Sequence, residues 1–539
     1  APAYRGVAYV VLDRFDVGDY GNRIPQLQFE VIRPIGRLSR QVRAVSLLPG
    51  AIEYGLSPVV VTRTQRPGEE QAVNRNVLFA GTDISASLDE LQAVCPNLEH
   101  VALISTWFGD DLRAGSCRVR PAVTDAAETG FSSPWVVSGL PRAEAPVVSY
   151  HDGGAAYGGT PSDRSVLDAI AEIKARGLSV TLYPFMMMDI PTGNALPDPE
   201  GRAAQPPYPW RGRITCDPAP GRDGSADGTA GARAQVAAFC GAARSADFSA
   251  DTDTVRFSGA GDWGYRRLVL HYAHLAAMAG GVDAFLIGSE LRGLTRLRDG
   301  DGRFPFVEEL CALAADVRAV LGPDTRITYG ADWSEYFGYH PADGSGDVYF
   351  NLDPLWSHPA IDAVGIDNYM PLSDWRDADY AGGNPDGFCG PYDPDGLKAA
   401  VAGGEGFDWY YPSAEARVAR ERAPITDGAY AKPWTYRYKD IVSWWSNAHY
   451  DRVGGVERPQ PTGWVPYGKP VWLTELGCPA VDKGPNQPNI FPDPKSSESG
   501  APYFSTGGRS DGAARRFLGA HLGHWGDAEP RFEETANPL

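Results

Sequence analysis

The sequence is short of positive charge. It has 49 Lys and Arg residues against 68 Asp and Glu residues, a formal net charge of −19. Proteins that bind DNA or RNA take much of their affinity from Lys and Arg neutralising phosphates, and docking on an anionic membrane also needs basic residues. We therefore expect no direct nucleic-acid partner and no docking on an anionic lipid surface.

Long apolar runs are missing as well. No uninterrupted run approaches the roughly 18–20 residues that cross a bilayer, so we expect no membrane insertion. The opening residues, APAYRGVAYVVLDRFD, lack an initiator Met and the basic and long apolar regions of a signal peptide. We interpret the chain as a fragment or a processed product.

Motifs that hold metals or activated nucleophiles are also absent. The seven Cys are an odd number and include no CxxC, so we expect neither a zinc ribbon nor a dithiol redox centre, but free and mostly buried thiols. The GxSxG nucleophile elbow does not occur. We expect no metal and no organic cofactor. The acidic turn Asp299–Gly302 leaves calcium binding open as a minor alternative.

What the sequence does contain is a globular composition, with 43% hydrophobic and 22% charged residues. Residues 1–85 have the pattern of a small β-rich segment. Its expected strands are Tyr4–Leu12, Leu27–Ile32, Val59–Thr62 and Asn76–Phe79.

From about residue 86 apolar runs alternate with amphipathic helices. The expected helices are Ser87–Val94, Asp163–Ala175, Tyr265–Ala279, Val307–Val320 and Ala513–His521. The expected strands are Val101–Trp107, Val147–Tyr150, Leu178–Phe185, Val282–Gly288, Arg326–Ala331, Ile361–Asn368 and Pro470–Thr474. Strand–helix alternation with continuously apolar strands predicts parallel strands covered on both faces. We therefore predict an α/β fold, a (β/α)₈ TIM barrel over residues 86–539. An eighth strand is not evident, so either it lies beyond this fragment or one strand is misassigned.

Three insertions interrupt the alternation, at about residues 110–145, 191–261 and 372–469. Each leaves the C-terminal end of an expected strand, which in a barrel is the active face, so we expect them to shape a cleft. The last insertion, Leu372–Lys469, should form a wall of that cleft. Its tryptophans either stack on sugar rings or supply the core of the loops themselves. They are Trp375, Trp409, Trp434, Trp444, Trp445 and Trp464.

Two expected strands end in a glutamate. VDAFLIGSEL places Glu290 at the end of the fourth, and PVWLTELGCP places Glu475 at the end of the seventh. A buried carboxylate is costly unless it is paired, hydrogen-bonded or protonated. Glycoside hydrolysis uses two such groups, so we predict Glu290 as general acid/base and Glu475 as nucleophile. Ion pairing at the barrel rim is the alternative for each residue, and Glu335 competes with Glu290 for the acid role.

These strand ends resemble the large clan of retaining glycoside hydrolases with (β/α)₈ barrels, and TELG resembles its nucleophile strand. The resemblance implies that Tyr369 hydrogen-bonds the nucleophile. The sequence departs from the clan at Ser289, where an Asn usually binds the sugar 2-hydroxyl. Further substrate-binding residues are expected at the strand ends and in the cleft. The set is Trp107, Asp110, His151, Asp152, Ser289, Trp333, Asp367 and Trp472.

Several stretches resemble more closely the TIM-barrel domain of gene transfer agent and phage tail proteins. They are YRGVAYVVL, YGNRIPQLQFEV, LPGAIEYG, STWFGDDLRAGSCRVRPAV and VGIDNYMPLSDW. The resemblance implies a host-contact module in the baseplate of a virion-like particle tail, assembled in the bacterial cytoplasm and released. Its partners would be other tail or baseplate proteins and a host surface polysaccharide.

Together these features predict a glycoside hydrolase-like module of a phage-like tail baseplate. It would hydrolyse or bind host cell-surface glycan, with a retaining two-carboxylate mechanism. The alternative is a catalytically inactive module that binds glycan or is purely structural.

Overall fold

The computed structural model describes residues 15–18, 21, 23, 34, 36–48, 53–77, 79–526 and 537–539. The expected strands Tyr4–Leu12 and Leu27–Ile32 lie outside the described residues. Of the other two strands expected early in the chain, only Thr62 at the end of Val59–Thr62 is extended, and the described part of Asn76–Phe79 is not a strand.

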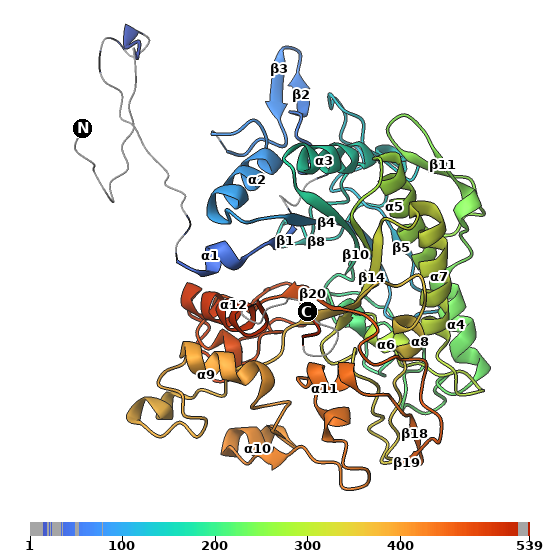
Figure 1. Cartoon of the computed structure of the whole chain (residues 1–539). Helices are drawn as coiled ribbons and strands as arrows, with labels where there is room; N and C mark the ends of the chain where they lie inside the picture. Colours follow the sequence, from blue (N-terminus) through green and yellow to red (C-terminus); the bar gives the residue numbers. More distant parts are fainter. Residues whose placement is uncertain are drawn as a thin grey trace.

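The core of the protein is one sheet of parallel strands that follow each other in chain order (Figure 1). The strands are β1 (Ala44–Leu47), β4 (His100–Gly109), β10 (Ser179–Met188), β13 (Ala284–Ser289), β14 (Arg326–Asp332), β15 (Val364–Asn368) and β20 (Val471–Leu476). Every neighbouring pair is parallel. With helices packed outside the sheet, this arrangement confirms the predicted α/β TIM barrel.

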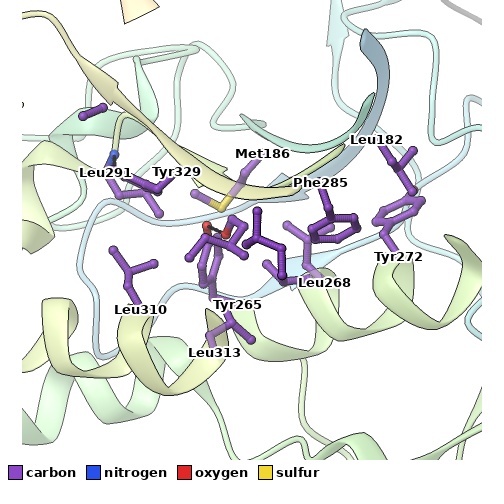
Figure 2. Close-up of a cluster of buried hydrophobic side chains, with 14 of the residues drawn as sticks. Leu182, Met186, Tyr265, Leu268, Tyr272, Phe285, Leu291, Leu310, Leu313 and Tyr329 are labelled. Carbon is purple, nitrogen blue, oxygen red and sulfur yellow. Dashed lines mark hydrogen bonds between the residues drawn. The ribbon is translucent and has the colours of Figure 1, made fainter. Parts of the chain in front are cut away.

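Helices cover the outside of the sheet. The longer ones are α2 (Asp83–Val94), α3 (Asp163–Ala175), α4 (Ala230–Cys240), α5 (Tyr265–Met278), α7 (Pro305–Leu321) and α12 (Asp511–Gly526). Helix α3 begins after Ser162, whose side chain accepts a hydrogen bond from the Ser165 N–H, and its buried stripe includes Val166 and Ile170. Figure 2 shows the same type of packing where Leu268 of α5 and Leu310 of α7 lie with strand residues in one apolar cluster.

Short helices and antiparallel strand pairs lie in the segments before and between the barrel strands. The helices are α1 (Leu38–Gln41), α6 (Arg292–Thr295), α8 (Asp353–Trp356), α9 (Pro394–Ala399), α10 (Ala414–Ala419) and α11 (Ile441–Ser446). The antiparallel pairs are β2 (Thr62–Arg66) with β3 (Glu69–Ala72), β6 (Val136–Val137) with β7 (Leu140–Pro141), β8 (Tyr150–His151) with β9 (Gly154–Ala155), β11 (Phe248–Ala250) with β12 (Val255–Phe257), β16 (Trp409–Tyr410) with β17 (Ala423–Pro424), and β18 (Arg452–Val453) with β19 (Val456–Glu457). Strand β5 (Val119–Arg120) pairs antiparallel with β4.

Two errors in the expected strand order cancel each other. The expected second strand, Val147–Tyr150, is wrong, because Val147 makes only an isolated bridge to Val123 and β8 pairs with β9 outside the barrel sheet. The strand missing from the prediction is β1, which pairs with β4 and is only four residues long with one buried side chain. The barrel sheet therefore reaches upstream of residue 86. Strands β13 and β20 are still fourth and seventh.

The last described residues extend the sheet beyond β20. The N–H of Val471, the first residue of β20, donates to the Pro538 carbonyl over 2.7 Å. Strand β15 pairs with β20 on its other side. The segment 537–539 therefore lies where an eighth barrel position is expected, although it is too short to count as a barrel strand.

The tryptophans of the last insertion form a core of their own. Trp375, Trp434, Trp444, Trp445 and Trp464 are all buried, and Trp409 is half-buried. The ring of His449 stacks on Trp464 with the ring centroids 5.6 Å apart, and it packs at a tilt against Trp444 at 4.8 Å. Five of the six side chains therefore supply apolar area inside the loops instead of an open stacking face for sugars.

The seven cysteines are free, and five of them are buried, as predicted. None of the helices in the described part of the chain combines the length and the apolar character needed to cross a membrane.

Candidate active site

Glu290 lies at a sharp turn directly after β13. Its φ is 53°, a left-handed conformation that is uncommon for a residue other than glycine and that stores strain. Two hydrogen bonds to β14 hold this turn. The Glu290 N–H donates to the Gly330 carbonyl over 2.8 Å, and the Leu291 N–H donates to the Tyr329 hydroxyl over 2.7 Å.

The Glu290 carboxyl group is buried and is held by an insertion loop. Its Oε2 accepts a hydrogen bond from the Trp210 indole N–H at 2.7 Å and lies 2.9 Å from Arg211 Nη2. Arg211 also donates to the carbonyl of Ser289 over 2.9 Å and to its hydroxyl over 2.5 Å. Trp210 and Arg211 lie in the insertion after β10, at the start of the 3₁₀ turn Arg211–Arg213. The insertion thus fixes the side chain of a strand-end residue.

The environment of Glu290 favours its protonated form. Burial raises the pKa of this carboxyl group to about 8, and Arg211 opposes the rise because its positive charge favours the carboxylate. The negative charges of Glu475 and Asp332 add to the upward shift of the pKa. A neutral carboxylic acid can donate a proton, which is the property required of a general acid.

Glu475 is held by two tyrosines. Tyr183 of β10 donates to Oε1 over 3.0 Å, and Tyr369, which follows β15, donates to Oε2 over 2.6 Å. Burial raises the pKa of both tyrosines well above the usual range, so both hydroxyls remain protonated donors. Hydrogen bonds from two hydroxyls orient the carboxylate and stabilise its negative charge.

A third carboxyl group, that of Asp367 on β15, completes the cluster. Glu290, Asp367 and Glu475 each offer one oxygen, and these three oxygens lie within 4.8 Å of one another. Asp367 is fully buried, and its Oδ1 accepts a hydrogen bond from the Thr474 hydroxyl at 2.6 Å. Burial, followed by the charges of the two glutamates, raises the pKa of Asp367 well above its usual value. The cluster therefore holds more acidic groups than it can ionise together.

The absence of a side chain at Gly330 on β14 makes room for the cluster. A Cβ atom at this position would lie 2.9 Å from Asp367 Oδ1 and 3.2 Å from the Cβ of Ser289. Both distances are shorter than ordinary van der Waals contact, so a side chain at this position would push Asp367 and Ser289 away from Gly330.

The donor set around the three oxygens suits proton chemistry better than a divalent cation. The Arg211 guanidinium already supplies a positive charge at Glu290, and the two tyrosine hydroxyls occupy lone pairs of both Glu475 oxygens. A divalent ion among the three carboxyl groups would be repelled by that nearby guanidinium. The acidic turn Asp299–Gly302 is no better a cation site, because the two Asp299 oxygens accept bonds from Arg233 and from backbone N–H groups.

Five of the residues expected at the site come together. They are Glu290, Glu475, Tyr369, Ser289 and Asp367. Glu335, the competing acid, is buried beneath them. Its carboxyl group accepts bonds from the Thr295 and Tyr329 hydroxyls, so it supports the turn at Glu290 and does not face the cluster.

Trp107 and Trp472 lie away from the cluster. Trp107 is fully buried between the barrel and α5, where its ring contacts His271 at 5.4 Å and Tyr272 at 6.2 Å. Side chains alternate along a strand, and this one points outward to the helix layer. Trp472 is the second residue of β20 and pairs with Gly365, so it lies towards the end of the strand opposite Glu475.

The other expected residues lie on surrounding loops. Asp110 accepts a bond from Arg120 at 3.1 Å and lines a cavity of about 260 Å³. His151 and Asp152 belong to the β8–β9 hairpin, where the His151 ring packs on Tyr208 at 5.8 Å. Trp333 follows β14 and packs on Tyr438 of the last insertion at 4.8 Å. The cluster of three carboxyl groups does not include these four residues, although the Trp333 N–H donates to the Asp367 carbonyl over 3.1 Å.

Sequence reasoning missed Tyr183, Trp210 and Arg211. Tyr183 has a weak signal, because it is a polar-tipped residue inside the apolar strand run TLYPF. Trp210 and Arg211 have none, since the stretch PYPWRGR has no periodicity that ties it to a residue 80 positions away.

Two distant loops meet beside the cluster, and we name them the clasp: residues 207–213 after β10 and residues 491–498 after β20. Arg213 pairs with Glu498 at 2.5 Å and 2.9 Å, and the Ser497 N–H donates to the Pro207 carbonyl over 2.8 Å. At the far end of the clasp, Phe491 packs edge-on against Tyr369 at 5.8 Å. The clasp therefore touches the partners of both glutamates.

Comparison with known structures finds GH113 mannanases at low similarity. A GH113 β-1,4-mannanase shares 16% identity over 54% of this chain and 58% of its own, with a TM-score of 0.27. A complex structure of a GH113 β-1,4-mannanase shares 16% identity over 54% of this chain and 58% of its own, with a TM-score of 0.26. The GH113 β-mannanase AaManA from Alicyclobacillus acidocaldarius in complex with ManMIm gives 14% over 79% of this chain and 88% of its own, with a TM-score of 0.25. The chain thus spans 58% of the first two structures.

A search of curated proteins finds no match. A family model, described as the GTA TIM-barrel-like domain, matches residues 263–538, which is just over half of the 539 residues. The matched region contains Glu290, Asp367, Tyr369 and Glu475, together with strands β13, β14, β15 and β20. The chain therefore belongs to the GTA TIM-barrel-like domain family.

Proposed function

We propose that this domain is a retaining glycoside hydrolase with Glu290 as general acid/base and Glu475 as nucleophile. One observation carries the proposal: the two carboxyl groups meet with oxygens no more than 4.8 Å apart, in opposite environments. Retaining enzymes hold the two groups roughly 5–5.5 Å apart, whereas inverting enzymes need roughly 6.5–9.5 Å to admit a water molecule between them and the sugar. The short separation favours retention.

The geometry assigns each group a step. Glu475 attacks the anomeric carbon while the glycosidic C–O bond breaks, and Glu290 gives its proton to the departing oxygen. A covalent glycosyl-enzyme results, and Glu290 is now a carboxylate. It then takes a proton from water as that water attacks the anomeric carbon, the bond to Glu475 breaks, and both groups return to their starting states. This sequence requires neither a metal nor an organic cofactor.

Our proposal of a substrate class and a setting rests on the family. We infer that the domain acts on a bacterial host's surface polysaccharide as part of a phage-like tail baseplate, alongside other tail proteins, in a particle assembled in the bacterial cytoplasm and released. Membership of the GTA TIM-barrel-like domain family supports this role. The net charge of −19 is in keeping with a glycan partner and not with nucleic acid.

A second candidate is a module that binds glycan or is purely structural, without turnover. It is favoured by Ser289, because the related clan usually has Asn there and the Ser289 hydroxyl is already engaged by Arg211. A barrel can be retained for binding alone, since fold does not fix activity.

The deciding experiment is a screen of the purified protein against host capsule, lipopolysaccharide and peptidoglycan, followed by trapping. A 2-deoxy-2-fluoro glycoside of the sugar that is released should add its glycosyl mass to the intact protein, and proteolysis should locate the label on Glu475. The Glu475→Gln variant should not be labelled. The matched control, Glu308→Gln on the outer surface of α7, should be labelled like the wild type. Binding of a host glycan without turnover or labelling would support the second candidate.

A further inference from the structure

Asp367 lies beneath the two glutamates with half of its carboxyl group unpaired. Oδ1 accepts one bond from Thr474, while Oδ2 is buried and has no hydrogen-bond partner among the described residues. In the sheet, Asp367 pairs directly with Glu475 of β20. A buried carboxylate normally collects several donors or a cation, because an ionised group without them is very costly.

The groups that surround Asp367 supply little compensation. Titratable and charged groups face it from every neighbouring element: Tyr183 of β10, Arg211 of the insertion, Glu290 after β13, Asp332 of β14, Tyr369 after β15 and Glu475 of β20. Three of these are acids. The cation, Arg211, is bonded to Glu290 and Ser289, not to Asp367.

The hydrogen bonds decide where the protons of the cluster reside. Glu475 accepts hydrogen bonds from two tyrosines, and a carboxylate is the stronger acceptor for both of them. Asp367 accepts from one hydroxyl only, so a proton on Oδ2 leaves its single bond intact and removes a negative charge from an enclosed site. The proton is therefore better placed on Asp367 than on Glu475.

We propose that Asp367 is a neutral carboxylic acid in the working site and acts as a positioning residue, by storing the proton that would otherwise neutralise Glu475. The inference rests on the proposed function, because it assigns a state to the same site. Three carboxyl groups then share two protons, on Glu290 and Asp367, and Glu475 alone keeps the charge with which it attacks.

Stability against pH tests the protonation state without any need for turnover. The pKa of Asp in an unfolded chain is about 3.9, so at a higher pH an Asp367 that is neutral in the fold must take up a proton when the protein folds. Wild-type stability should then fall, relative to Asp367→Asn, as the pH rises from 5 towards the folded pKa of Asp367. Asp367→Asn is close in shape, keeps an acceptor for Thr474 and cannot ionise.

The measurement is urea unfolding of the two proteins at several pH values from 5 to 8. Asp379→Asn is the matched control, because Arg420 lowers the pKa of Asp379 to about 2 and that group is ionised in both states across the range. Its stability difference from wild type should stay constant. If the stability difference between Asp367→Asn and wild type also stays constant with pH, the proposal is overturned, because Asp367 would then be ionised in the folded protein.

Kinetics supply a second readout that a merely structural role would not move. If Asp367 is neutral, Asp367→Asn removes no charge. The pH at which kcat/KM declines on the alkaline side reports the pKa of Glu290, so it should be the same in this variant as in wild type, even if the turnover rate changes. If Asp367 were ionised, the substitution would lower the pKa of Glu290 and move that limb to lower pH by a unit or more. Such a move would overturn the proposal. So would a result in which added Ca²⁺ or Mn²⁺ stabilises the wild type but not Asp367→Asn. Absence of turnover in wild type would instead contradict the proposed function and leave the unfolding test in force.

Discussion

The two glutamates are held by different parts of the molecule. Glu475 belongs to a barrel strand, and its partners Tyr183 and Tyr369 come from or directly follow two other barrel strands. Glu290 sits on a strained turn, and its partners Trp210 and Arg211 come from a long insertion. Glu475 is thus fixed by the barrel, whereas Glu290 is fixed by a loop.

This difference separates what each part of the chain contributes. The barrel presents a carboxylate whose two oxygens are both bonded, so its orientation follows from the sheet. The insertion buries the other carboxyl group and so raises its pKa to about 8. Changes in the insertion should therefore alter proton transfer, and changes in the strands should alter the attack on the sugar.

The largest effects are expected from the glutamates themselves. Glu475→Gln keeps the shape and removes the negative charge that forms the covalent intermediate, so turnover should fall by orders of magnitude with little change in glycan affinity. Glu290→Gln removes the proton donor only. Aryl glycosides with good leaving groups should still be attacked, and the glycosyl-enzyme should accumulate because its hydrolysis lacks a base.

Azide distinguishes the two roles. It attacks the intermediate without help from a base, so it should restore turnover to Glu290→Ala and yield a glycosyl azide of retained configuration, while Glu475→Ala should give none of that product. If the two Gln variants cleave a natural glycan as fast as wild type does, both residues are structural.

The next largest effect should come from the tyrosines. Tyr183→Phe and Tyr369→Phe each remove one donor to the Glu475 carboxylate, and a hydrogen bond to a charged group contributes about 1.5–3 kcal/mol, so kcat/KM should fall about 10- to 100-fold. Tyr272→Phe is the control, because this tyrosine lies on α5 and its hydroxyl accepts a hydrogen bond from Ser105 of β4 and not from a residue of the acidic cluster. If kcat/KM falls equally in all three variants, the cause is a general loss of stability and not the loss of a hydrogen bond to Glu475.

A smaller effect concerns the pH profile. The acid form of Glu290 is the active one, so kcat/KM should decline above pH about 8. Arg211 favours the ionised form, so Arg211→Met should raise the pKa of Glu290 and move the alkaline limb to higher pH by roughly one unit. Arg213→Met, the neighbouring control, should leave the limb in place. A limb that moves to lower pH would show that Arg211 does not act on Glu290.

The smallest effect is expected at the clasp. Arg213 and Glu498 are each about one-third exposed, and ion pairs of this kind are worth up to about 1 kcal/mol. A double-mutant cycle with Arg213→Met and Glu498→Gln should give a coupling energy of that size in unfolding and a change in KM rather than kcat. Strong loss of kcat would mean that the clasp also holds Trp210 in place for proton transfer.

Much of the barrel could be predicted from the sequence, because buried parallel strands leave continuous apolar runs. Strand β1 could not, since AVSL is four residues long and only Leu47 is buried. The positions of Glu290 and Glu475 as fourth and seventh survived only because the false strand at Val147–Tyr150 replaced β1 in the count.

The candidate site was predictable where it lies on strand ends. Glu290, Glu475 and Tyr369 follow apolar runs, which places them on one face of a barrel. Trp107 also lies near a strand end, but the direction of its side chain depends on strand parity, and it faces α5. Arg211 was out of reach, because an insertion's path across the barrel is decided by tertiary packing.

The bare backbone of Gly330 has a consequence for how relatives of this domain diverge. An added Cβ would lie 2.9 Å from Asp367 Oδ1, so in a descendant that keeps the acidic cluster a larger residue there would have to displace the Asp367 carboxyl group. A descendant that uses the barrel only as a scaffold has no such restriction. We therefore expect Gly at this position of β14 in relatives that keep three carboxyl groups together, and a freer choice of residue in relatives that do not.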